Sequence, residues 1–235
     1  MASTLDDLLA DPPLVHGPEG SNELLTHGLV ETALRWIEAN VRAGDRTLET
    51  GSGLSTCLFA MKGTRHTCIT PQQQEVDRLL EWCRSHGVST DGLDFRVDVS
   101  ERVLPELDTG PLDLVLIDGS HSFPQVFIDW FYVQQALKVG GHLVVDDVHV
   151  WTGRVLRGFL AAEPEWKLVQ EFSGRTVCFR KAAEVDPNRL WTDQPYVWKR
   201  TRPGVVGRAR MAGAMVRSGE YREVVDRVVA LARRK

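Results

Sequence analysis

The 235-residue sequence has few cysteines, no long apolar run and little net charge. No run of roughly 18 apolar residues occurs, and the acidic start MASTLDDLLADPP has no basic stretch before an apolar one, so we predict neither a membrane span nor an export signal. A net charge of −4 disfavours nucleic acid as a partner. The cysteines form no CxxC pair, and their apolar surroundings suit buried thiols in a reducing cytoplasm: Cys57, Cys68, Cys83 and Cys178.

The central part of the chain alternates between short apolar runs and helical segments. This alternation predicts an α/β fold, a Rossmann-like, doubly wound, mostly parallel sheet of seven strands. The expected strands are 46–50, 65–70, 93–98, 112–118, 141–147, 166–172 and 175–181, with helices over 55–63, 71–87, 122–141 and 151–164. Only two residues separate the last two strands, which predicts a terminal antiparallel hairpin.

The flanking segments differ from this centre, so we expect a helical cap over 1–45, a central domain over 46–182 and a basic extension over 183–235. In the cap, a helix over 21–44 is predicted, with Ser21 as N-cap, Gly44 as its end and an apolar stripe of Leu25, Leu29, Ala33, Ile37 and Val41. The extension ends in an amphipathic segment, 220–235, and eleven basic and three acidic residues after Trp198 give a net +8. We favour a solvated helix packed on its own domain or on a second subunit in a homodimer, over one that binds phosphates or an acidic partner.

A glycine-rich turn, LETGSGLST, follows the first predicted strand. Gly51 and Gly53 would let the backbone approach a ligand, and the helix that begins near Ser55 would offer free N–H groups to an anionic group. Glu49 would stand at the end of a central strand, where a buried carboxylate needs a partner such as a ligand ammonium. A tight turn without a ligand is the alternative. Thr56, in place of a third glycine, and a second strand that ends without an acid disfavour a nicotinamide cofactor.

The fourth and fifth predicted strands end in carboxylates, the fourth in Asp118 and the fifth in Asp146 and Asp147. Neighbouring parallel strands would bring all three together, where like charges repel unless a cation lies among them. Three hard oxygen donors predict a site for Mg²⁺ or a similar ion. Each aspartate taken alone is as well explained as a helix cap or a partner for loop hydrogen bonds. His121, three residues after Asp118, is the candidate general base, and His149 is its rival.

Three stretches, LETGSGLST, LDLVLIDGSHSF and LKVGGHLVVDDVHVWTGRV, resemble the class I S-adenosylmethionine-dependent methyltransferases. Within that class, residues 25–181 are similar to metal-dependent O-methyltransferases of the catechol type and of the bacterial type that modifies sugars and natural products. The resemblance implies that Glu49, Gly51, Gly53 and Ser55 surround the amino-acid end of the cofactor. It matches Asp118, Asp146 and Asp147 to the metal ligands, and it places His121, or Asp118 itself, as the base.

The resemblance also implies an adenine contact at Ser100 and Glu101, with Asp98 as an alternative. It departs from the family at Thr70, where an acid usually accepts hydrogen bonds from the ribose and where this hydroxyl or Gln72 would have to substitute. The expected activity is Mg²⁺-assisted methylation of a small-molecule hydroxyl, in a catechol or a vicinal diol, since two adjacent oxygens can chelate one ion. The alternatives are a metal-independent N- or O-methyltransferase and a non-catalytic protein that binds a partner through the same fold.

Overall fold

The computed structural model describes residues 4–17, 28–186 and 188–201, and the single residues 210, 213, 214, 217, 218 and 226. The chain divides into two compact units, Met1–Pro187 and Asn188–Lys235. Within its described residues, the second unit contains the 3₁₀ turn η2 (Trp191–Asp193) and helix α8 (Pro195–Thr201). The helix predicted over 220–235 lies outside the described residues apart from Asp226, as do Ser21 and Leu25.

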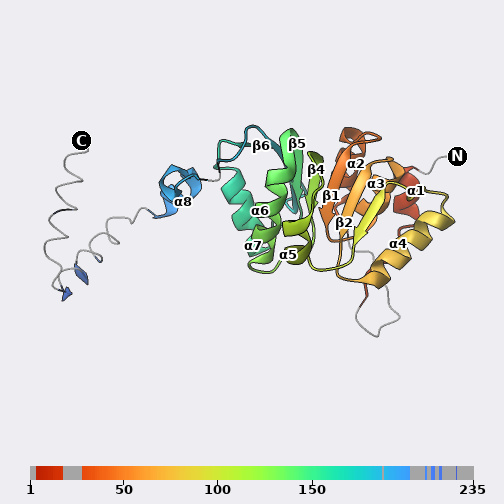
Figure 1. Ribbon diagram of the computed structural model, residues 1–235, viewed down its shortest axis with the longest axis horizontal. Helices are drawn as coiled ribbons and strands as arrows, with labels where there is room; N and C mark the ends of the chain where they lie inside the picture. Colours follow the sequence, from red (N-terminus) through yellow and green to blue (C-terminus); the bar gives the residue numbers. More distant parts are fainter. Residues whose placement is uncertain are drawn as a thin grey trace. The chain divides into compact units, whose positions relative to one another are not determined.

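A seven-stranded sheet forms the centre of the first unit (Figure 1). Its strands are β1 (Arg46–Thr50), β2 (Arg65–Ile69), β3 (Leu93–Arg96), β4 (Leu112–Ile117), β5 (Leu137–Val145), β6 (Trp166–Phe172) and β7 (Thr176–Lys181). Their spatial order is β3-β2-β1-β4-β5-β7-β6. Strand β7 runs antiparallel to the other six strands, which are parallel to one another. The predicted fold class, including the terminal hairpin, is confirmed.

Helices cover both faces of this sheet. One apolar cluster joins α1 (Leu5–Ala10), α2 (Glu31–Asn40), α3 (Leu54–Met61) and α4 (Gln73–Ser85) to one face of the strands. The other joins the 3₁₀ turn η1 (Leu104–Glu106), α6 (Gln125–Ala136) and α7 (Trp151–Leu160) to the opposite face. Figure 1 shows α6 and α7 beside β4 and β5, away from α1 and α4. None of the described helices is long and apolar enough to cross a membrane.

The N-terminal segment contributes to the first of these clusters. Leu5, Leu8 and Val15 are buried there. Two hydrogen bonds from α4 hold the segment in place: the Trp82 indole N–H donates to the carbonyl of Asp11 at 2.7 Å, and the guanidinium of Arg78 donates to the carbonyl of Val15 at 2.6 Å. The segment is therefore part of the core of the first unit.

The helix predicted over 21–44 is shorter than expected. Helix α2 begins at Glu31, after residues 28–30 that are not helical, and Val41 beyond its end is extended. The apolar stripe holds, since Leu29, Ala33, Ile37 and Val41 are buried. The prediction of a continuous helix was wrong because apolar spacing persists where the backbone has left the helix.

The helix predicted over 122–141 was also too long. Helix α6 ends at Ala136, and β5 begins at the next residue, Leu137. The pairing of β5 with β4 shifts register between Leu112 and Leu114, so the early part of β5 is an irregular extension of the strand. The short helix α5 (Ser100–Val103) and η1 were not predicted, because both are too short to show a period.

Candidate active site

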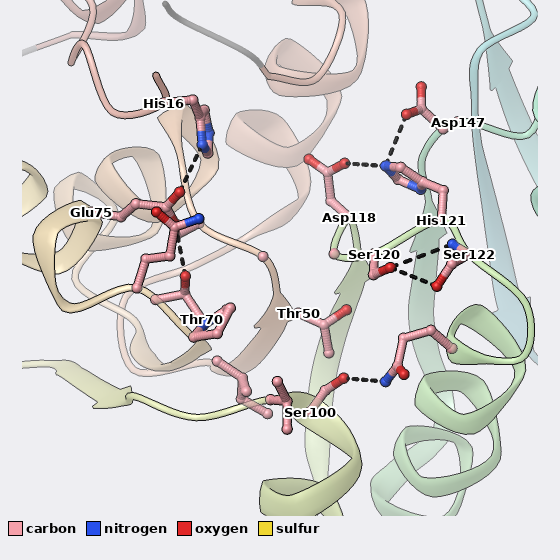
Figure 2. Close-up of a pocket in the computed structure, with 18 of the residues that line it drawn as sticks. His16, Thr50, Thr70, Glu75, Ser100, Asp118, Ser120, His121, Ser122 and Asp147 are labelled. Carbon is pink, nitrogen blue, oxygen red and sulfur yellow. Dashed lines mark hydrogen bonds and ion pairs between the residues drawn. The ribbon is translucent and has the colours of Figure 1, made fainter. Parts of the chain in front are cut away.

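A cavity of about 690 Å³ lies along the carboxyl ends of the parallel strands, a size suited to a small-molecule ligand. The chain reverses its winding direction there, since β1 pairs with β2 on one side and with β4 on the other. Figure 2 shows two groups of polar side chains in this cavity, one around Glu75 and one around His121, with Thr50 between them.

Several predicted site residues line this cavity: Gly51, Thr70, Ser100, Glu101, Asp118, His121 and Asp147. Five others lie nearby without lining it: Glu49, Gly53, Ser55, Asp98 and Asp146. The Asp98 carboxylate accepts a hydrogen bond from the Val99 N–H at 2.7 Å, which organises the start of α5. The structure therefore collects most of the predicted residues at one place, from five strand ends.

The Glu49 carboxylate has its partners within the protein. The side chain is 1% exposed and accepts hydrogen bonds from the hydroxyls of Ser55, at 2.6 Å, and Thr56. The ring of His66 lies 3.1 Å from the same carboxylate. These contacts tie the end of β1 to the first turn of α3, so Glu49 fixes the shape of the glycine turn.

Gly51 stands where the end of β1 meets the end of β4. Its φ is +94°, and a Cβ at this position would lie 2.3 Å from the carbonyl oxygen of Asp118. Only glycine tolerates both conditions, since other residues rarely adopt this φ and the obstacle is backbone. The close approach of the two strand ends therefore depends on this one residue.

Gly51→Ala is expected to lower the free energy of unfolding by more than a positive φ alone would, because the added Cβ would also meet the carbonyl oxygen of Asp118. Gly44→Ala is the matched control, because Gly44 has a φ of +84° with nothing within 4 Å of the added Cβ and should lose only about 1–2 kcal/mol. Urea unfolding of both variants measures the difference. If both variants lost the same free energy of unfolding, the added Cβ at position 51 would avoid the carbonyl oxygen of Asp118 without destabilising the protein.

The three aspartates are brought together, but with cations of the protein beside them. The guanidinium of Arg175, in the β6–β7 turn, has Nε 2.8 Å from Asp147 Oδ1 and Nη2 3.5 Å from Asp146 Oδ2. Asp146 is 1% exposed, and its Oδ1 accepts a hydrogen bond from the Thr176 hydroxyl. Among the residues that the structure describes, no three His, Cys, Asp or Glu side chains are arranged to hold a metal ion.

Asp118 differs from the other two in its ionisation. Burial, and then the nearby carboxylates of Asp146, Glu49 and Asp147, raise the pKa of Asp118 well above its ordinary value. A carboxyl group with a raised pKa is a stronger base than an ordinary aspartate once it is ionised.

His121 lies between two of these aspartates. Its Nε2 is 2.9 Å from Asp147 Oδ2 and 4.0 Å from Asp118 Oδ1, as Figure 2 shows. The Thr152 hydroxyl donates to the backbone carbonyl of His121 and holds the loop that carries it. His149, the rival base, is more than half exposed, with Nδ1 3.5 Å from Asp147 Oδ1, and does not line the cavity.

The far end of the cavity contains a second ordered network. The Ser100 hydroxyl donates to Asp129 Oδ1 at 2.6 Å and accepts from the Gln125 amide at 2.7 Å. Burial raises the pKa of Asp129, although hydrogen bonds from Ser100, Thr50 and Gln125 oppose the shift. This network fixes the loop after β3, where Val99, Ser100 and Glu101 face the cavity.

Glu75 is one of the cavity residues that the sequence did not predict, together with His16, Gln125 and Arg175. It lies in the first turn of α4, and its Oε2 accepts hydrogen bonds from the hydroxyls of Ser52 and Thr70, both at 2.7 Å. Its Oε1 is 3.0 Å from Nδ1 of His16, which comes from the N-terminal segment. A carboxylate thus lies beside the end of β2, although the residue that follows the strand is Thr70 and not an acid. The signal for Glu75 in the sequence is an acid five residues after Thr70.

Residues 48–148 match a family model described as "Methyltransferase domain". Among curated proteins, the chain is similar to uncharacterized protein R132 of Acanthamoeba polyphaga mimivirus, with 28% identity over 93 residues. That match covers 38% of this chain and 42% of the viral protein, so it spans less than half of either.

Solved structures of low sequence identity share the fold. Cofactor-bound Rv0187 from MTB has 21% identity and a TM-score of 0.56, over 68% of this chain and 84% of that one. The O-methyltransferase TomG from Streptomyces achromogenes, involved in tomaymycin synthesis and solved with SAM, has 19% identity and a TM-score of 0.53, over 66% and 82%. An rRNA methylase from Streptococcus thermophilus has 13% identity and a TM-score of 0.51, over 65% and 95%.

These likenesses agree with the fold of the first unit. Structures of this fold include an O-methyltransferase involved in tomaymycin synthesis and an rRNA methylase, so the fold does not select an acceptor. Residues 48–148 are therefore similar to a methyltransferase domain, and the first unit has the fold of solved structures that are described as methyltransferases.

Proposed function

We propose that this chain transfers a methyl group from S-adenosylmethionine to a hydroxyl of a small molecule. The observation that carries the proposal is a cavity with two different sides. On one side, hydrogen bonds converge on the Glu75 carboxylate, and on the other, His121 lies between carboxylates. Methyl transfer from a sulfonium needs an oxygen nucleophile in line with the methyl group. Holding both partners in one cavity supplies several kcal/mol of the barrier, about 7–11 kcal/mol in the best intramolecular cases.

We assign the Glu75 side to the ribose of the cofactor. A carboxylate has about four acceptor sites, and His16, Ser52 and Thr70 occupy three of those on Glu75. A ribose hydroxyl can donate to the remaining site or replace the hydroxyl of Ser52 or Thr70. Glu75 would then do what an acid at the end of β2 does in the family that the sequence resembles, and Gly51 would let the cofactor approach the backbone between the two sides.

We assign the proton acceptor role to His121. Nε2 lies 2.9 Å from Asp147 Oδ2, a contact that favours the tautomer with the proton on Nε2 and a lone pair on Nδ1. As the acceptor oxygen forms its bond to the methyl carbon, the carbon–sulfur bond breaks, the sulfonium becomes a thioether and the hydroxyl proton passes to Nδ1. Asp118 is the alternative base, because its raised pKa favours proton uptake.

Magnesium assistance, the expectation from the resemblance, does not fit this arrangement of side chains. Two of the three expected ligands, Asp146 and Asp147, lie against Arg175, and Asp146 is almost fully buried. We therefore assign no step of the reaction to a metal ion. The positive charge beside Asp146 and Asp147 comes from Arg175.

The partner we propose is a small-molecule acceptor, and neither a membrane nor nucleic acid has a part in the proposed reaction. The position of His121 in the lining of the cavity supports this, because a small acceptor that enters the cavity reaches its ring. A homodimer remains our proposal for the assembly, on the basis of the amphipathic segment 220–235.

Titration calorimetry with S-adenosylmethionine and S-adenosylhomocysteine tests the proposal at its first step. We expect binding of both, with one site per chain. The absence of heat with either compound, in protein shown to be folded, would overturn the methyltransferase activity. Methyl transfer to a panel of catechols, sugar diols and simple alcohols then separates an enzyme from a protein that only binds the cofactor.

A further inference from the structure

The turn between β6 and β7 places one cation against the expected metal ligands. The hairpin is tight, with Ser173 and Gly174 at φ of 51° and 66°, and the Arg175 N–H donates to the carbonyl of Phe172 at 3.0 Å. The carbonyl of Arg175 accepts from the Val148 N–H at 2.8 Å, next to Asp147. The backbone of Arg175 is therefore joined directly to the segment that carries the carboxylates.

The guanidinium of Arg175 contacts both carboxylates of the pair after β5. It lies against Asp147 with Nε at 2.8 Å and against Asp146 with Nη2 at 3.5 Å. The second oxygen of Asp146 is taken by Thr176, the residue that follows Arg175. The hairpin thus supplies a hydrogen bond to one oxygen of the buried Asp146, while the other, without a hydrogen-bond partner among the described residues, has the guanidinium beside it as an ion pair.

We infer that Arg175 takes the place of the divalent ion expected at this site, so that a positive charge of the protein lies against Asp146 and Asp147 and the reaction runs without metal. A guanidinium stays charged at any pH at which the protein is folded, unlike an ion whose occupancy depends on supply. Arg175 also fixes Asp147, which in turn contacts His121, so Arg175 is a positioning residue for the proposed base.

This inference rests on the proposed function and extends its acceptors to compounds with a single hydroxyl. A metal selects acceptors that have two adjacent oxygens, because two oxygens chelate one ion. Without that requirement, a single hydroxyl held near His121 is sufficient. We therefore expect acceptors with one hydroxyl to be methylated as readily as catechols or vicinal diols of similar shape.

The test measures metal binding without using activity. In thermal unfolding with increasing Mn²⁺ or Mg²⁺, the Tm of the wild-type chain should not change. Arg175→Gln leaves the carboxylates without their cation and should create a binding site, with a rise in Tm of about 5–10 °C at a hundredfold excess over Kd. Arg175→Lys keeps a positive charge and should behave as the wild type. Arg154→Gln, an exposed arginine on α7, is the control for the loss of one charge.

A rise in Tm of the wild-type chain with Mn²⁺ that Asp147→Asn abolishes would overturn the inference. So would a folded Arg175→Gln variant that gains no metal response. If Arg175→Gln does not fold, the metal titrations of the wild type and of Arg175→Lys still test the inference, because a rise in Tm of the wild type would contradict it. Cofactor calorimetry is read separately, so a chain that binds neither cofactor would overturn the proposed function while leaving the metal result intact.

Discussion

Replacing His121 by alanine or glutamine is expected to lower kcat for methyl transfer by about 10²- to 10⁴-fold, the usual contribution of a positioned general base. The affinity for S-adenosylmethionine should stay unchanged, because the groups we assign to the ribose lie on the other side of the cavity. Glutamine can keep a hydrogen bond to Asp147 but cannot take the proton, so both variants should lose activity alike. Steady-state kinetics and calorimetry measure the two quantities.

His149→Ala is the matched control for this result. His149 also contacts Asp147, at 3.5 Å, but it is more than half exposed and does not line the cavity, so its removal should change kcat little. An unchanged rate in His121→Ala would move the base to another residue. A loss in Asp118→Asn without a loss in His121→Ala would identify that residue as Asp118.

Glu75→Ala is expected to weaken binding of S-adenosylmethionine and S-adenosylhomocysteine by about 10- to 100-fold, since a hydrogen bond to a charged acceptor contributes about 1.5–3 kcal/mol. Both compounds carry the same ribose, so both should lose affinity equally. Glu75→Gln should lose less, because the amide oxygen still accepts a hydrogen bond. Calorimetry gives each Kd directly.

The control lies on the same helix. Glu81→Gln removes an exposed carboxylate that pairs with Arg84, and it should leave both affinities unchanged. Equal affinities in the wild type and Glu75→Ala would contradict the assignment of the ribose to this side of the cavity.

Glu75 should also remain effective over a broad pH range. Burial acts to raise its pKa, but hydrogen bonds from His16, Ser52 and Thr70 outweigh burial, and the pKa lies below its ordinary value of 4.5. A lowered pKa in the folded state means that the stabilisation is present above the ordinary value and is lost only as the pH falls through the lower folded value. The stability difference between the wild type and Glu75→Gln should therefore shrink in acid and stay constant near neutrality.

The sheet was predictable from the sequence for a physical reason. Strands buried on both faces read as short apolar runs, and LVLI in β4 ends at Asp118 as abruptly in the structure as in the sequence. Helix ends were less predictable. The apolar spacing of the predicted helix 21–44 continues through Gly28, while only the backbone reveals that α2 begins at Glu31.

The site was predictable where its residues stand at strand ends, because topology alone brings those ends together. Asp118, His121 and Asp147 meet at the cavity for that reason. The partners of these residues come from elsewhere: Arg175 from a hairpin turn, His16 from the N-terminal segment and Glu75 from inside a helix. Such contacts depend on how the elements pack, and no spacing in the sequence records them.

The packing of the N-terminal segment has a consequence for protein engineering. A chain shortened to the family-matched stretch 48–148 would keep the glycine turn and the aspartates, yet it would lose the buried Leu5, Leu8 and Val15 as well as His16. The exposed apolar face left on α3 and α4 would favour aggregation. Anyone transplanting this domain into another protein should therefore include residues 4–17, because His16 lines the cavity and Leu5, Leu8 and Val15 pack in the core.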